Sequence, residues 1–584
     1  MDLGVIGNCQ YSALVDSHAN VSFLCWPRFD SDFAFASLLD AEKGGMFRIH
    51  PPTGERGEQR YLPNSNILST TFRTETGSFE VIDFAPRFQQ NDRFFKPVTL
   101  IRIVRILRGQ PNISVDINPI YDYGIGKMKG DISSNHIRFT GGGRTLRLYS
   151  NASLNLIQEG RPFPGTETIY FALTYNGTLA KPLKETCELD LEKTLGYWQR
   201  WVKHCVLPRS YQKEVIRSAL VLKIHQFEDT GAMIAATTTS IPEARGTERN
   251  WDYRYCWLRD AQMMVWTLHT LNHFEELEEF IRFLRMLTQD TSDLQPVYGI
   301  SGEKNLTEIR LEHLKGYKGN GPVRIGNAAY MQSQYDVYGG LIVALSPLYL
   351  DVRFRNEAKV LSTQLVRDLL DKIERFFSTP DAGIWEYRGE KKVYTYTVLQ
   401  HWKGATKAME IGKFCSDETL YQKASQIAEK AANYLGNSSW NEKHGFYSQN
   451  LDGPFADASL LMLINSGFLD KANPKAVKHV ENYVKILGTK GGFLKRYIHE
   501  DDFGDTENAF IICSFWLVEA YARLGDFEKA RILMDKLIGI SNNLGLYSED
   551  LDPATGELWG NFPQTYSHVG LIRAAFALSP PWFE

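Results

Sequence analysis

Long apolar stretches are missing from this sequence. No run reaches the roughly 18 apolar residues that a membrane-spanning helix needs, and the mean hydropathy is −0.30. The N-terminal residues MDLGVIGNCQYSALVDSHANVSFLCW also lack the charged region followed by a continuous apolar region that marks a secretory signal. The sequence therefore predicts a soluble, cytoplasmic protein with no membrane partner.

An excess of one charge sign is missing as well. The 584 residues carry 65 Lys and Arg against 69 Asp and Glu, which gives a net charge of −4, and the basic residues are scattered along the chain. Nucleic acid is excluded as a partner, because its phosphates require a basic patch or stripe. A homo-oligomer is compatible with this composition, but the sequence does not choose between one subunit and several.

Motifs for metals, nucleotides and serine nucleophiles are also absent. The seven cysteines are odd in number, widely spaced and free of C-x-x-C pairs, which indicates buried free thiols rather than structural zinc. No G-x-x-x-x-G-K-[ST] or G-x-G-x-x-G opens a helix after a strand, and no G-x-S-x-G occurs. The sequence predicts no metal and no cofactor, which leaves carboxylates as its chemical resource.

Aromatic residues, in contrast, are abundant, at 12% of the chain with 12 Trp and 28 Tyr. The stretch NWDYRYCWLRD, residues 250–260, interleaves four rings with two arginines and two aspartates. Core packing is the simple explanation for many rings, but flat rings also cover the apolar faces of sugars. Carboxylates beside aromatics are what glycoside hydrolysis requires: one acid for the leaving oxygen and one carboxylate on the opposite face.

The chain is long enough for more than one hydrophobic core, and its pattern changes once. Residues 3–195 contain short, closely spaced strand patterns, such as VTLIRIVRIL and TIYFALTY, which predict an antiparallel β-sandwich. Helical spacing begins at residue 189 and continues in ten or more amphipathic segments, one of which, residues 211–231, is expected to end at Gly231. We therefore predict a multidomain α and β protein: a β-sandwich domain (1–188), a linker helix (189–209) and an (α/α)6 barrel of six helical hairpins (210–584).

The chemically dense segments lie between the predicted helices. Five of them are rich in Trp, Tyr, Arg and acidic residues, namely 250–260, 298–336, 383–390, 491–510 and 544–568. In a closed ring of hairpins, loops at one end converge on the axis, so distant segments can form one pocket.

Several of these segments resemble glycoside hydrolase family 15, the glucoamylase, glucodextranase and trehalase-type family. The motifs are RNWDYRYCWLRDA, HLKGYKGNGPVRIGNAAYMQSQYDVYG, IWEYRG, CSFWLVEAYARLG and GNFPQTYSHVGLI, in the expected order, and the N-terminal IGNCQYSALVDSHANVSFLCWPRFDSDFAFASLLD is similar to prokaryotic-type members. The resemblance implies a β-sandwich, a linker and an (α/α)6 barrel. It also implies inverting hydrolysis of α-glucosides at the non-reducing end, releasing β-glucose, without a metal or organic cofactor.

The resemblance also implies a catalytic pair. Glu386, in IWEYR, corresponds to the general acid, and the neighbouring Trp385 is expected to keep its surroundings apolar. Glu549, in LYSED, corresponds to the general base, with Asp550 as its main competitor. Inversion requires the two carboxyl groups to lie about 6.5–9.5 Å apart, so that a water molecule fits between them and the sugar.

Substrate-binding residues follow from the same resemblance. Arg259 and Asp260 match the family pair that holds the hydroxyls of the terminal glucose, although an Arg-Asp pair at a helix start can also serve only as a cap. The remaining predicted binding residues are Tyr253, Trp257, Tyr317, Trp385, Arg496, Glu507 and Tyr566. Gly316 is a further candidate for substrate contact, and Arg324, Asn327 and Gln334 are expected mainly to hold the loop wall by hydrogen bonds.

The function is predicted to be that of an exo-acting α-glucoside hydrolase of glucoamylase or glucodextranase type, acting on α-gluco-oligosaccharides. The alternative is an α,α-trehalase, and a remote alternative is a non-catalytic sugar-binding protein on the same fold. The segment after the acid departs from the family at Val398, Thr406 and Lys407, so the leaving-group side of the site is expected to differ. Linkage preference lies in the shape of that side.

Overall fold

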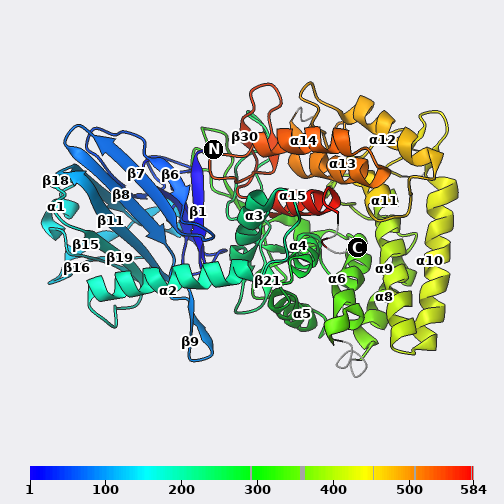
Figure 1. Cartoon of the computed structure of the whole chain (residues 1–584), viewed down its shortest axis with the longest axis horizontal. Coiled ribbons are helices and arrows are strands. Elements are labelled where there is room, and N and C mark those ends of the chain that lie inside the picture. Colours follow the sequence, from blue (N-terminus) through cyan, green and yellow to red (C-terminus); the bar gives the residue numbers. More distant parts are fainter. Residues whose placement is uncertain (290–292, 355–361, 451–452, 505–507, 581, 583–584) are drawn as a thin grey trace.

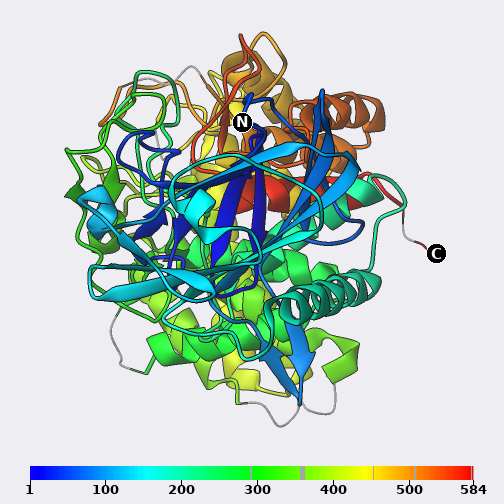
Figure 2. The same ribbon diagram turned by 90° about the vertical axis from the view of Figure 1, so that its left-hand side faces the viewer.

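The computed structural model describes residues 1–289, 293–354, 362–450, 453–504, 508–580 and 582. A β-rich part and a helical part lie side by side, and a long helix, α2, runs along both (Figure 1). Turned by 90°, the sheets lie in front of the helical part (Figure 2). This arrangement confirms the predicted order of an antiparallel sandwich followed by a helical barrel.

Two antiparallel sheets form the β-sandwich. The first has the order β1 (Leu3–Gly7), β2 (Ser12–Asp16), β3 (Asn20–Cys25), β5 (Met46–His50), β12 (Asn112–Asn118) and β18 (Phe163–Pro164), with β4 (Phe33–Phe35) paired to β3. The second has the order β15 (Lys129–Ile132), β16 (His136–Gly141), β17 (Arg144–Ser150), β19 (Ile169–Tyr175), β11 (Thr99–Gly109), β8 (Gly77–Phe84), β7 (Leu68–Thr74) and β6 (Glu58–Tyr61). A separate hairpin, β9 (Phe88–Gln90) and β10 (Arg93–Phe95), projects beyond them.

The two sheets share a dry core. Phe47 of the first sheet and Phe171 of the second meet edge to face with ring centroids 6.3 Å apart. The fully buried Arg102 pairs with Asp83 at 2.7 Å and donates to the carbonyl of Phe47 at 2.7 Å, so it ties one sheet to the other. A buried charge is tolerated here because it is both paired and hydrogen-bonded.

The linker helix α2 spans Leu183–Lys203 and begins six residues before the predicted position 189. Pro182 stands just before its first turn, where a missing N–H costs nothing, and the helical pattern then starts at once. Trp201, near its end, donates to Glu276 of the barrel at 3.1 Å. Glu276 also accepts from the buried Lys223 at 2.9 Å, so the linker is held to the barrel by a buried polar network.

Helical hairpins close into a ring in the described chain. The inner helices are α4 (Leu258–Thr270), α6 (Asp336–Leu350), α9 (Thr395–Phe414), α11 (Met462–Asn465, preceded by the 3-10 turn Ala458–Leu461), α13 (Ile511–Leu524) and α15 (Thr565–Ala577). Each contacts the next, and α15 contacts α4. The outer helices are α3 (Gln212–Ile224), α5 (Glu275–Leu287), α8 (Gln364–Phe376), α10 (Glu418–Ser438), α12 (Pro474–Leu487) and α14 (Phe527–Gly539).

Inner and outer helices differ in sequence as their positions require. The inner helix α6, DVYGGLIVALSPLYL, is apolar on nearly all sides and is buried along most of its length. The outer helix α8, QLVRDLLDKIERF, buries one stripe, Val366, Leu369, Leu370, Ile373 and Phe376, and leaves its charges in solvent. A helix surrounded by others needs apolar residues all round, whereas a peripheral one needs a single apolar face.

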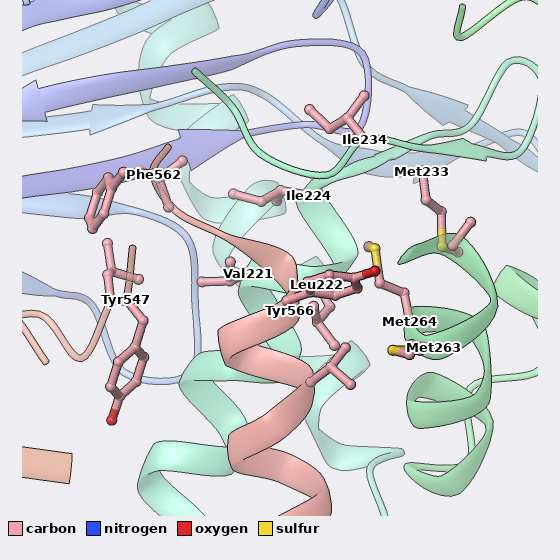
Figure 3. Packing of buried hydrophobic residues seen from close by; sticks show 14 of the residues in the cluster. Val221, Leu222, Ile224, Met233, Ile234, Met263, Met264, Tyr547, Phe562 and Tyr566 are labelled. Carbon is pink, nitrogen blue, oxygen red and sulfur yellow. The ribbon is translucent and has the colours of Figure 1, made fainter. Parts of the chain in front are cut away.

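Side chains from α3, α4 and α15 fill the space where the ring closes. Figure 3 shows Val221 and Leu222 of α3 next to Tyr566 of α15, with Met264 of α4 alongside. The predicted end of helix 211–231 is wrong: α3 stops at Ile224, and Gln226–Phe227 pair with Ala232–Met233 as the hairpin β20–β21. Gly231, at φ +90°, lies in the turn of that hairpin, which its sequence context did not reveal.

Short strands between the helices hold the connecting loops at one end of the ring. The strand β22 (Cys256–Trp257) pairs with β23 (Val297–Tyr298) immediately before α4. A second small sheet, β28 (Ala509–Phe510), β29 (Asp550–Leu551) and β30 (Leu558–Trp559), brings two of the predicted site segments together. Over the described residues, no helix combines the length and apolar character needed to cross a membrane.

Candidate active site

A cavity opens at the N-terminal ends of the inner helices and has about 780 Å³ of space free of protein atoms. Its wall includes nine of the residues predicted to form the site, drawn from four of the five segments: Tyr253, Trp257, Arg259, Asp260, Trp385, Glu386, Arg496, Glu549 and Tyr566. Because side-chain pockets in helical toroids form where the loops converge, this location agrees with the expectation from the loop sequences.

Glu386 lies in the loop before α9 and projects into this cavity wall. Its Oε1 accepts from Trp257 Nε1 at 2.7 Å, and from Arg259 Nη2 and Gln334 Nε2, both at 3.3 Å. Its backbone has φ +63°, a left-handed conformation that is costly for a residue with a side chain and that recurs at functional sites. About 22% of the side chain stays exposed, so a ligand in the cavity can reach it.

Glu549 lies just before β29 and is almost fully buried. Tyr253 donates its hydroxyl hydrogen to Glu549 Oε1 at 2.9 Å, and Gly560 packs against the other side of the carboxyl group. Burial raises the pKa of Glu549, and the negative charge of Glu243 raises it further, while Arg496 acts in the opposite direction. Asp550 is also buried with a raised pKa, but it does not line the cavity, whereas Glu549 does.

Two neighbouring rings connect the two carboxylates. Tyr253 binds Glu549 and Trp257 binds Glu386, and the two ring centroids lie 5.4 Å apart in an edge-to-face arrangement. Glu549 lies 296 positions from Tyr253 along the chain, and Glu386 lies 129 positions from Trp257. Tyr253 and Trp257, which hold them, are only four residues apart. The rings were predicted to contact sugar; the structure shows that they also hold the carboxylates in place.

The Arg259–Asp260 pair occupies the first turn of α4, at the floor of the cavity. Arg259 Nη1 donates to Gln334 Oε1 at 3.1 Å and to the carbonyl of Ile384 at 2.8 Å, and Arg259 Nε donates to the hydroxyl of Tyr566. Burial raises the pKa of Asp260 to about 6. Gln334, expected mainly as a loop hydrogen bonder, contacts both Arg259 and Glu386.

A third buried carboxylate, Glu243, lies in the cavity wall and was not singled out from the sequence. Arg496 donates to Glu243 Oε2 at 2.5 Å, and Trp251 Nε1 donates to Glu243 Oε1 at 2.9 Å. Nothing in the local sequence IPEARGTERN marks this glutamate, because its partners lie in other segments. Only the folded chain brings it beside Glu549.

The mouth of the cavity is formed by a charged and aromatic wall that sequence reasoning also missed. Arg249 donates to Asp501 at 3.0 Å, and the backbone N–H of Arg388 donates to Asp502 at 2.6 Å. The ring of Phe503 meets that of Trp251 with centroids 4.8 Å apart. Arg388 and Asp502 are exposed, in contrast to the buried floor. The sequence did indicate segment 491–510 as part of the site, but it did not distinguish Asp501, Asp502 and Phe503 from their neighbours.

Some predicted residues lie elsewhere. Tyr317 does not line the cavity; its ring packs edge-on against Trp559, and it borders a surface hollow beside the N-terminus. Glu507 lies outside the described residues. None of Val398, Thr406 and Lys407 lines the cavity either. Val398 is buried within α9, and the other two line a different cavity at the far end of the ring.

Metal ligation was tested on the donor groups that the structure describes. No group of three or more His, Cys, Asp or Glu side chains in the described ranges is arranged to hold a metal ion. All seven cysteines are free thiols; five are buried, as predicted, whereas Cys205 and Cys415 are partly exposed.

Comparison with known proteins gives matches along the whole chain. The family model for glycosyl hydrolases family 15 matches residues 209–576, and the model for the trehalase-like N-terminal domain matches residues 2–161. A trehalase of Mycolicibacterium smegmatis is 31% identical over 98% of this chain and 90% of its own, and a trehalase of Thermoplasma volcanium is 30% identical over 98% and 92%.

Among solved structures, a bacterial glucoamylase complexed with acarbose superposes with a TM-score of 0.72, covering 98% of this chain and 93% of that one at 14% identity. At that identity the match concerns the fold. Fold, cavity and family matches together define a glycoside hydrolase. The chain belongs to glycosyl hydrolases family 15.

Proposed function

We propose that this protein is an α,α-trehalase that hydrolyses its substrate with inversion at the attacked carbon. The observation that carries the proposal is the similarity, over nearly the full length of both chains, to several proteins named trehalase. The trehalase-like match of the N-terminal domain supports it as well. The trehalase alternative is thereby better supported than the glucoamylase-type activity favoured by sequence reasoning.

In this proposal Glu386 is the general acid. Three donors converge on its Oε1, which leaves Oε2 to carry the proton that passes to the leaving oxygen. Its partly exposed side chain can reach a bond between two sugars, whereas the fully buried carboxyl groups below it cannot. The C1–O bond to the leaving glucose breaks as this proton arrives.

Glu549 is proposed as the general base. It lines the same cavity, and Tyr253 occupies only one of the lone pairs on its two oxygens, so capacity remains to accept a proton from water. The water oxygen then bonds to C1 from the face opposite to the leaving group. Tyr253 and Trp257, packed against each other, set the separation of base and acid.

The buried floor is proposed to bind the glucose that is attacked. Arg259 Nη2, whose bonds to Glu386 and Asp260 are long at 3.3 and 3.5 Å, is proposed to donate to one hydroxyl while Asp260 accepts from the neighbouring one. The leaving glucose is then directed toward the mouth. There the exposed wall of Arg388, Asp502 and Phe503 offers charged groups and a ring to a second sugar.

Parallel assays on trehalose, maltose and isomaltose test the proposed substrate. Trehalose is expected to be the best substrate by kcat/KM, and proton NMR of fresh product should show α- and β-glucose in equal amounts. Only the attacked glucose inverts, because the other leaves with its own C1–O bond intact. Turnover of maltose but not trehalose would refute the trehalase assignment, and α-glucose alone as first product would refute inversion.

Replacing Glu243 by Gln is expected to move the acidic limb of the pH profile of kcat/KM to lower pH. A base acts when deprotonated, so activity rises as the pH rises through the pKa of Glu549. The negative charge of Glu243 raises that pKa, and a neutral amide removes this effect while Arg496 still lowers it. Glu248→Gln, in the same loop but exposed, is the matched control and should leave the limb in place. A limb that stays or moves to higher pH in Glu243→Gln would contradict this reading.

A further inference from the structure

A second cavity lies inside the ring of inner helices, toward their C-terminal ends. It is lined from different helices by Gln262, Trp266, Trp402, Lys403, Asn465 and Arg573. Arg573 follows Tyr566 by seven residues on α15, which places it about 10 Å farther along the helix, at ~1.5 Å per residue. The space free of protein atoms, including its opening to solvent, amounts to about 990 Å³.

Lys403 is a cation without a counter-charge in this cavity. Among the residues that the structure describes, its ammonium group makes no hydrogen bond or ion pair. The other cations around it are compensated: Lys407 pairs with Glu410 at 2.7 Å, and Arg523 and Arg573 both bind Glu519. Four cationic groups thus face two carboxylates, and this surplus of positive charge favours an anion.

Two buried oxygen atoms nearby have no hydrogen-bond partner. Gln262 Oε1 and Asn465 Oδ1 are both unsatisfied and both residues line the cavity. The amide nitrogen of Asn465 donates to the carbonyl of Trp516 at 3.0 Å, which leaves Oδ1 as the free end. Gly340 gives Gln262 its room, because a Cβ there would come within 1.7 Å of Oε1. Buried acceptors of this kind are normally paired, and these two are free to accept hydrogen bonds from the hydroxyl groups of a ligand.

We propose that this second cavity binds a phosphorylated monosaccharide. The ammonium group of Lys403 receives the phosphate, Gln262 and Asn465 accept hydrogen bonds from sugar hydroxyls, and the half-buried rings of Trp266 and Trp402 cover apolar surface of the sugar. This site is separate from the cavity that holds Glu386 and Glu549, and no residue lines both.

Binding at this site is coupled to protonation. Burial lowers the pKa of Lys403 to about 7, and Arg573, Arg523 and Lys407 lower it further while Glu519 raises it. In the described chain, α4, α6 and α11 contribute only uncharged side chains to the lining. An anion beside Lys403 favours the ammonium form, so binding at pH 8 should take up protons.

Isothermal titration with glucose 6-phosphate tests the proposal, with excess glucose present to occupy the catalytic cavity. The unmodified protein is expected to bind, and Lys403→Met should weaken binding at least about tenfold, which corresponds to about 1.4 kcal/mol. Lys407→Met, one turn along the same helix at a residue already paired with Glu410, is the comparison and should weaken binding much less than Lys403→Met does. Titration at pH 8 in buffers of different ionisation enthalpy should show proton uptake that Lys403→Met loses.

Two further measurements separate the parts of the proposed ligand. Gln262→Met is expected to weaken glucose 6-phosphate and to leave inorganic phosphate unchanged, because it removes only a hydroxyl acceptor. Lys403→Met should keep its hydrolytic kcat and should not unfold at lower temperature, since it removes a half-buried charge that forms no ion pair among the described residues. Absence of glucose 6-phosphate binding, its displacement by glucose, or equal binding by Lys403→Met would overturn the site. Equally tight binding of inorganic phosphate would overturn the sugar assignment.

Discussion

Glu386→Gln is expected to lower kcat for trehalose by about 10²–10⁴-fold, the usual contribution of a general acid. The amide keeps the size of the side chain and can still accept from Trp257, but it cannot supply a proton to the leaving oxygen. Steady-state kinetics on trehalose measure the loss. A change in KM much smaller than the change in kcat is expected, because the glucose-binding floor is untouched.

A substrate that needs no protonated leaving group separates acid catalysis from structural damage. α-Glucosyl fluoride releases fluoride without help from an acid, so Glu386→Gln should retain most of its turnover of this compound. Glu390→Gln, in the same loop but exposed and paired only with Lys392, is the matched control and should behave as the unmodified enzyme does. Equal loss on both substrates would remove Glu386 from the role of acid.

Glu549→Ala is expected to lower kcat by a similar factor, about 10²–10⁴-fold, on trehalose and on α-glucosyl fluoride alike. Both reactions need a base for the attacking water, in contrast to the acid, which only one of them needs. The alanine leaves space beside C1, so added azide should restore part of the turnover of the fluoride and form β-glucosyl azide, detectable by NMR.

Asp550→Asn is the comparison for this variant. Asp550 is buried next to Glu549, but it lies outside the cavity wall, so its replacement should leave kcat within a few fold of the unmodified enzyme. Full activity in Glu549→Ala together with a large loss in Asp550→Asn would assign the base to Asp550 instead. Formation of α-glucosyl azide would contradict attack from the face opposite to the leaving group.

The candidate catalytic groups of the cavity are held in place by side chains of one short stretch, residues 250–260. Tyr253 binds Glu549, and Trp257 binds Glu386. Arg259 binds both Glu386 and Tyr566. Charge-assisted hydrogen bonds of this kind hold side chains from distant loops in defined positions. The stretch 250–260 therefore holds the two candidate catalytic carboxylates as well as lining the cavity.

Much of the fold was accessible from sequence because its signals are local. The strand patterns of residues 3–195 and the helical periodicity from residue 189 onward depend on neighbouring residues alone, and the predicted order of a sandwich followed by a helical barrel was confirmed. Errors occurred at boundaries, where local signals compete. The linker helix starts at Leu183 because Pro182 is tolerated before a first turn, and α3 stops at Ile224 because the next residues pair as strands.

The cavity residues that sequence reasoning missed share one property: their partners are far along the chain. Glu243 binds Arg496, and Arg249 binds Asp501, each more than 250 positions away. Lys403 is similar, because its isolation depends on which inner helices surround it. Charge and burial of this kind have no local pattern, so a single sequence carries no signal for them.

The sequence by itself determined the class of fold and the residue types of the site. Hydrophobic periodicity and loops rich in aromatic residues and carboxylates are properties of short segments, so they can be recognised without knowing the rest of the structure. Only the tertiary structure decided which carboxylates share a cavity, which ones interact electrostatically, and that Tyr317 lies outside it. Those outcomes depend on the distances between segments that folding brings together. Coulomb and desolvation energies depend on these distances and not on the separation of residues along the sequence.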